Sequence, residues 1–256
     1  MQAAPTPVLL RGTIAAARNA LDLLYDAQVL AEAGSAARAY SLAALAVEEA
    51  GKAGSLVLLT VMPETLRARA PAGRMLEWHQ LKQVQGLFIA KVPYCMPEVA
   101  PWLSALPPGE LAEFLSGLDA PADEADSLKR RGLYVDVGRG GAIRQPSEIT
   151  EAELLSQLAR AGQAASKAGH LLEPETPARL LHPPAETVEL SRAAVSALTE
   201  ASYARTPEAA TNVMIKMISK LRDRLAVKDA KGIPGPGELL ARRHQTHRAQ
   251  VRYREA

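Results

Sequence analysis

Titratable side chains stand out in two stretches of this sequence. The first stretch, LAALAVEEAGKAG, is rich in alanine and leucine, yet it carries Glu48, Glu49 and Lys52. The second, WHQLK, carries His79 and Lys82 three residues apart. Carboxylate, imidazole and ammonium groups that meet inside a helical bundle shift one another's pKa values and can serve in binding or proton transfer. A buried charge without a partner is costly, so we expect these groups to pair.

Helical periodicity predicts which of these charges face the core. Positions 42, 45, 49, 52, 56 and 59 form one stripe, because steps of three and four residues return to the same face, and four of the six are leucine. The stripe predicts that Glu49 and Lys52 face the core, with Glu48 about 100° further round the helix. Two interpretations stay open: a structural pair of Glu49 and Lys52, and a polar pocket shared with His79 and Lys82.

The elements that must position these residues are helices. Apolar residues at helical spacing predict helices at residues 9–33, 36–62, 73–92 and from 147 onward. The one convincing extended segment is GLYVDVGRGG, residues 132–141, where glycines flank strand-prone residues. Together with the 4% content of aromatic residues, this pattern predicts an all-α bundle with a short strand-like segment. We expect a helical domain at residues 8–182 and a helical extension at 183–256.

Composition and charge limit the class of protein. The single cysteine, Cys95, excludes an intrachain disulfide framework and is typical of a reducing compartment. The N-terminus lacks a signal-peptide pattern and no segment has about 18 uninterrupted apolar residues, so we expect a cytoplasmic protein that does not span a membrane. The net charge is only +2, but residues 212–256 hold eleven Lys or Arg against four acidic residues. This basic tail is either a solvated extension or a contact surface for RNA or an acidic partner.

No cofactor or metal site is predicted. The sequence has no Walker-type phosphate loop, and VGRGGA follows too short an extended run and opens no helix. His244 and His247 have the spacing of metal ligands but no carboxylate or cysteine beside them. Cys95 has no histidine near it in sequence, so a nucleophilic role is not expected.

Three blocks of sequence in a fixed order carry a family resemblance. They are AYSLAALAVEEAGKA (39–53), WHQLK (78–82) and KRRGLYVDV (129–137), the last followed by an ITEAEL helix. In these blocks the chain resembles the AbiV-type abortive infection proteins, a branch of the HEPN-like α-helical bundles. The resemblance covers roughly residues 15–172. The resemblance implies a bacterial anti-phage protein that acts on RNA or translation. For HEPN-like domains more broadly it implies a homodimer that cuts RNA without a metal.

The nuclease signature of HEPN-like domains is an arginine, four to six residues and then a histidine. Arg74 and His79 satisfy it, but so do Arg242 and His247, which makes the pattern alone weak. Residues five apart in a continuous helix lie about 140° apart, so Arg74 needs to lie in the first turn or the preceding loop to converge with His79.

The resemblance also implies roles for the predicted catalytic residues. His79 would take the proton of a ribose 2′-OH, while Arg74 or Lys82 would stabilise charge on the phosphate. Glu48 or Glu49 would orient His79 or Lys82, and Tyr134 would donate a hydrogen bond. The alternative is a non-catalytic helical binding module that blocks a translation component or senses a phage protein as its activator.

Overall fold

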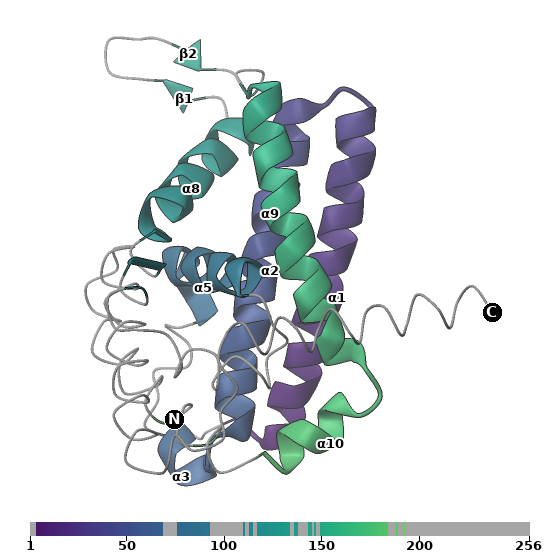
Figure 1. The fold of residues 1–256 in the computed structure, drawn as a ribbon, viewed down its shortest axis with the longest axis vertical. Helices are drawn as coiled ribbons and strands as arrows, with labels where there is room; N and C mark the ends of the chain where they lie inside the picture. The colour runs from purple at the N-terminus through teal and green to yellow at the C-terminus, as the bar shows by residue number, and fades with distance from the viewer. Residues whose placement is uncertain are drawn as a thin grey trace, which may run out of the picture.

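Long helices dominate the computed structural model of this protein (Figure 1). The structure describes residues 4–68, 76–92, 110, 113–114, 117–133, 136–137, 143–144, 146, 149–183, 188 and 192. Its elements are α1 (Thr6–Glu32), α2 (Ala36–Val61), α3 (Glu64–Arg67), α5 (His79–Lys91), α8 (Asp119–Leu133), β1 (Asp136–Val137), β2 (Ile143–Arg144), α9 (Glu151–Gly169), a 3₁₀ turn (His170–Leu172) and α10 (Thr176–Leu181). Helices α1, α2 and α9 pack side by side, and α5 runs across α2 (Figure 1). The predicted all-α bundle is confirmed.

The turn between α1 and α2 has a defined hydrogen-bond pattern. Gly34 has a positive φ of 76°, which glycine adopts without steric cost. Its N–H donates to the carbonyl of Ala31, and the N–H of Ser35 donates to the carbonyl of Leu30. These two bonds form a Schellman motif, which satisfies carbonyls left free at the end of α1 and reverses the chain. Helices α1 and α2 therefore form a hairpin.

Helix α2 lies at the centre and contacts α1, α5, α8 and α9. Its most deeply buried side chains are mostly small: seven alanines of α2 between residues 37 and 53 are buried, as are Gly51 and Gly54. Small side chains let the neighbouring backbones approach closely. A Cβ built on Gly51 would overlap the carbonyl of Lys82, and one built on Gly86 would overlap the carbonyl of Val47. Helices α2 and α5 therefore cross with their backbones in contact.

Two predicted helix boundaries need correction. The predicted helix at 36–62 is confirmed to within one residue, but the one at 73–92 is interrupted at Trp78, whose backbone is extended (φ −77°, ψ 103°) and whose indole is buried. Helix α5 therefore begins at His79, and residues 69–75 lie outside the described part. Helix α9 begins at Glu151 rather than near 147, because Thr150 and Glu153 form a capping box there.

The strand-like segment is smaller than predicted. Asp136 and Val137 pair antiparallel with Arg144 and Ile143 respectively. Leu133, expected in the extended segment, belongs to the last turn of α8. Of the predicted C-terminal extension, only positions 183, 188 and 192 lie among the described residues. Among the described helices, none combines the length with the hydropathy that a membrane span requires.

A candidate active site centred on Glu48

The centre of the candidate site is the carboxylate of Glu48, which lies in the middle of α2 and is 2% exposed. Its Oε2 lies 2.8 Å from His79 Nδ1 and 3.7 Å from Lys82 Nζ. Its Oε1 accepts hydrogen bonds from Lys129 Nζ and, at 3.2 Å, from Gln83 Nε2. We call these five residues the Glu48 cluster. Helices α2, α5 and α8 each contribute to it.

Opposite charges keep the buried groups of the cluster ionised. Burial alone would raise the pKa of Glu48, but the charge and hydrogen bond of Lys129, together with His79, hold this pKa below its ordinary value. Burial would likewise lower the pKa of Lys129, yet Glu48 and Asp126 raise it. For Lys82, burial outweighs the attraction of Glu48 and Glu49, so its pKa is lowered. Glu48 and Lys129 therefore form an ion pair. Lys82 lies beside this pair and gives up its proton more readily than an exposed lysine does.

Helix α8 holds Lys129 from a second side. Asp126 accepts from Lys129 Nζ at 3.0 Å and from the guanidinium of Arg130 at 3.0 Å. The hydroxyl of Ser41, on α2, contacts the carbonyl of Lys129 at 3.1 Å. These contacts fix the position of the ammonium group, and through it the position of the Glu48 carboxylate.

The exposed member of the cluster is His79, the first residue of α5. Its side chain is 57% exposed, against 3% for Glu48. An ionised carboxylate at Nδ1 favours the tautomer that carries its proton there, which leaves the lone pair of Nε2 free. Among the described residues nothing bonds to Nε2. The arrangement presents an oriented basic nitrogen to solvent.

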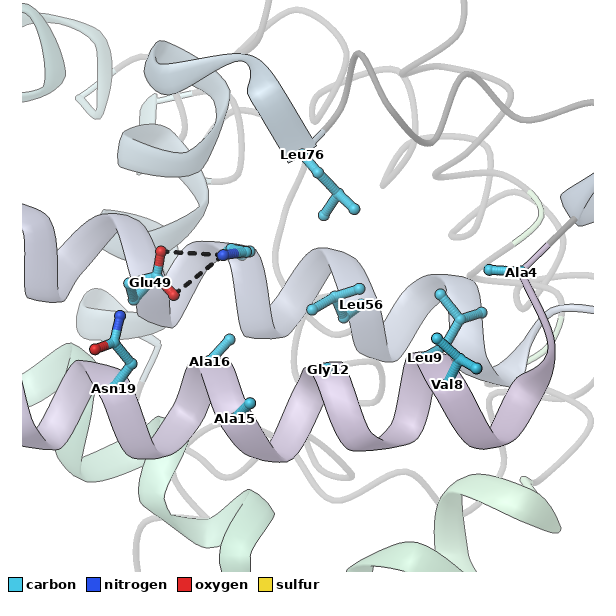
Figure 2. A pocket seen from close by; sticks show the side chains of 11 residues that line it. Ala4, Val8, Leu9, Gly12, Ala15, Ala16, Asn19, Glu49, Leu56 and Leu76 are labelled. Carbon is cyan, nitrogen blue, oxygen red and sulfur yellow. Dashed lines mark hydrogen bonds and ion pairs between the residues drawn. The ribbon is translucent and has the colours of Figure 1, made fainter. Parts of the chain in front are cut away.

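Glu49 and Lys52 do not belong to this cluster, which corrects the prediction that they face the core while Glu48 lies aside. They pair with each other at 3.2 Å, and their side chains are 17% and 35% exposed. They line a hollow of about 540 Å³ between α1 and α2, where Figure 2 shows the Glu49 carboxylate in its ion pair. The structural interpretation of this pair is the better one, although its charges reach Lys82 electrostatically.

Other predicted residues cannot be placed. Arg74, Tyr134, Arg242, His247 and the basic tail at 212–256 lie outside the described residues. Conversely, Lys129 and Gln83 belong to the cluster but were not predicted. Lys129 opens the KRRGLYVDV block, and Gln83 follows His79 by four residues on one helix face, so both signals were present in the sequence.

The described part of the chain offers little to hold a metal. Within it, no three His, Cys, Asp or Glu side chains gather into a possible ion site.

Two buried polar atoms in and beside the Glu48 cluster, Trp78 Nε1 and Gln83 Oε1, have no hydrogen-bond partner among the described residues. Such atoms are uncommon in folded proteins.

Comparison with known proteins bears on the whole helical region. The HEPN_AbiV family model, described as AbiV, matches residues 8–166, from the first turns of α1 into α9. Neither the curated proteins nor the solved structures gave a match. The family match includes the helices that carry Glu48, His79 and Lys129. Because it covers more than half of the 256 residues, this chain belongs to the AbiV family of HEPN-type proteins.

Proposed function

We propose that this chain is a bacterial anti-phage abortive infection protein that cleaves RNA without a metal, with His79 as its general base. The observation that carries the proposal is the contact between an exposed imidazole and a buried, ionised carboxylate. A carboxylate that orients a histidine and stabilises its protonated form is a recurring device in acid–base catalysis. Family membership supports an abortive-infection role for the whole chain.

The proposed reaction uses the ribose itself as the nucleophile. Nε2 of His79 takes the proton of the 2′-OH, and the 2′-oxygen bonds to the adjacent phosphorus. The bond from phosphorus to the 5′-oxygen then breaks, and that oxygen receives the proton. The products are a 2′,3′-cyclic phosphate and a 5′-hydroxyl end. Glu48 stabilises the imidazolium that forms, and the cation of Arg74 stabilises the phosphate charge.

The test compares two histidines that make the same contact. The purified chain is incubated with total RNA in the presence of a chelator, and fragments and their end groups are analysed. His79→Ala should abolish cleavage. His170 is the control, because its Nδ1 also meets a carboxylate, Glu173 at 2.7 Å, but both side chains are exposed at 48% and 44%. His170→Ala should cleave like the wild type.

Equal cleavage by both variants, or no cleavage by the wild type, would contradict the proposal. Circular dichroism of each variant shows whether it folds.

A non-catalytic binding module is the second candidate function. Lys82 and Lys129 are each 7% exposed and lie against Glu48, so they are poorly placed to reach a phosphate in solution. This burial favours a cluster that stabilises the bundle, while other surfaces bind a translation component or a phage protein. On that proposal, His79→Ala keeps full growth arrest and phage protection, and substitutions on the partner-facing surface abolish them.

A further inference from the structure

The hollow between α1 and α2 has the size and the lining of a small-molecule site. Its volume of about 540 Å³ lies within the range of about 300–1,000 Å³ that is usual for ligand pockets. Eight of its eleven lining residues are Gly, Ala, Val or Leu, and the other three are Asn19, Glu49 and Lys52. A mostly apolar lining with a few polar groups is the usual form of a site for a small organic ligand.

Helical spacing gives the hollow an apolar end and a polar end. A Cβ built on Gly12 would lie 3.5 Å from Leu56, so these two residues face each other. Helices α1 and α2 run antiparallel, and Asn19 follows Gly12 by the same seven residues by which Glu49 precedes Leu56. Asn19 therefore faces Glu49, as Figure 2 shows. Leu76, from the segment before α5, lines the hollow from a third side.

The ion pair at the polar end keeps capacity for further hydrogen bonds. Lys52 Nζ lies 3.2 Å from one oxygen of Glu49 and 3.3 Å from the other. An ionised carboxylate offers about four lone-pair sites, and an ammonium group has three N–H donors, so both groups can also bond to a ligand. Their side chains are partly exposed. The polar end therefore presents two carboxylate acceptors with a cation beside them.

Guanine is the RNA base that best complements this end of the hollow. Its Watson–Crick edge carries two adjacent donors, N1–H and the N2 amino group, beside the acceptor O6. The donors match the two oxygens of Glu49, and O6 matches the ammonium group of Lys52. Adenine, cytosine and uracil each present one donor group on this edge, so they form fewer bonds to a carboxylate. The flat ring would pack on the aliphatic side chains of Leu56 and Leu76.

The hollow adjoins the Glu48 cluster. Leu76 lines the hollow and precedes His79 by only three residues. The charge of Glu49, at the polar end, also acts on Lys82 of the cluster. A base in the hollow therefore belongs to a nucleotide near the exposed imidazole.

We propose that the hollow between α1 and α2 binds the guanine base of an unpaired guanosine in RNA, with Glu49 accepting from N1–H and the N2 amino group and Lys52 donating to O6. The guanosine must be unpaired, because pairing in a duplex occupies the same edge of the base. That the protein cuts the bound RNA rests on the proposed function, whereas binding in the hollow does not. The proposal names single-stranded RNA containing guanosine as the substrate class.

The first test measures the Kd of three mononucleotides for the full chain by calorimetry. GMP, IMP and AMP carry the same ribose phosphate, so differences in Kd report on the base. GMP should bind roughly tenfold more tightly than IMP, which lacks the N2 amino group, and than AMP. A series of roughly 10 µM to 10 mM suits a small ligand held mainly by its base. Equal Kd values for the three nucleotides overturn the proposal.

Variants assign the binding to the hollow. Glu49→Gln should bind GMP no more tightly than AMP, because an amide has one acceptor oxygen instead of two. Glu173→Gln is its control, because Glu173 also pairs with a residue three positions away. Ala15→Phe fills the hollow from its exposed rim and should weaken GMP binding by roughly tenfold or more, because a filled pocket excludes the base. Ala159→Phe makes the same change at an exposed position on α9.

Both control variants should bind GMP like the wild type, and circular dichroism shows whether each variant folds. A Glu49→Gln variant that keeps the preference for GMP overturns the proposal. An Ala15→Phe variant that folds and binds GMP unchanged does so as well.

RNA ligands distinguish guanosine in RNA from a free nucleotide. A short unpaired RNA with one guanosine should bind more tightly than GMP, and more tightly than the same RNA with adenosine in that place. Binding no tighter than GMP overturns the assignment to RNA. The wild type should also cut beside the guanosine. Selective binding of GMP without any RNA cleavage contradicts the proposed function alone, and RNA cleavage with equal Kd values for the three nucleotides contradicts this proposal alone.

Discussion

Adjacent glutamates on α2 should respond very differently to the same substitution. Glu48→Gln removes the only carboxylate that lies against Lys82 and one of two that pair with Lys129, among the described residues. Removing one partner of a buried ion pair costs about 3–5 kcal/mol, because the remaining charge is left uncompensated. Glu49→Gln removes a partly exposed partner of Lys52, and such pairs contribute less than about 1 kcal/mol.

Thermal and urea unfolding of the two variants measure this difference. For a domain of this size each kcal/mol shifts Tm by about 2–4 °C, so Glu48→Gln should lower Tm by about 6–20 °C. Glu49→Gln should lower it by no more than about 4 °C. A Glu49→Gln variant that loses as much stability as Glu48→Gln would refute the assignment of Glu48 as the buried centre. The comparison is well matched, since both substitutions remove one charge and conserve side-chain size.

Two other predictions concern pH and packing. The folded state holds the pKa of Glu48 below its ordinary 4.5, so its contribution to stability is present above that pH and is lost as pH falls through the folded value. The pKa of Lys129 is raised above 10.5, so its contribution to stability is complete below that pH and is lost as pH rises through the folded value. The free energy of unfolding, measured against pH, should show both losses. The Glu48→Gln variant should lack the loss at acid pH. Gly51→Ala should cost at least about 1–3 kcal/mol in urea unfolding, because the added Cβ overlaps the backbone of α5. Gly162→Ala meets no atom within 4 Å and should be neutral or stabilise by about 0.5–1 kcal/mol; equal losses at both glycines would contradict the close crossing.

The sequence predicted the helices well because their periodicity and end signals are local. Its inference about the charges of α2 was reversed for a physical reason. Leucines at 42 and 45 marked the expected core side, yet they are only half buried, while the alanines around them are fully buried. In an alanine-rich bundle the helices approach most closely where side chains are smallest. Glu48 lies among those alanines, and Glu49 lies beside the leucines.

Lys129 could not have been assigned to Glu48 from periodicity. The two residues are 81 positions apart in sequence, and nothing local specifies how α8 is oriented against α2. The contact between His79 and Glu48 was easier to predict, because both residues stood out as titratable groups in predicted helices. Its geometry depends on how α5 crosses α2, which nothing local in the sequence specifies.

Because the backbones of α2 and α5 touch at Gly86, a tilt of α5 against α2 turns about this contact. His79 lies seven residues, or about 10 Å along the helix axis, from the contact at Gly86. The C-terminal end of α5 is bound to α9, because Lys167 Nζ donates to the carbonyl of Ala90 at 2.6 Å and to that of Val92. A tilt of roughly 6° about the Gly86 contact moves the imidazole by about 1 Å, which takes its 2.8 Å contact with Glu48 beyond hydrogen-bonding range. Lys167, at the opposite end of α5, thus helps to set the position of the His79 ring against Glu48.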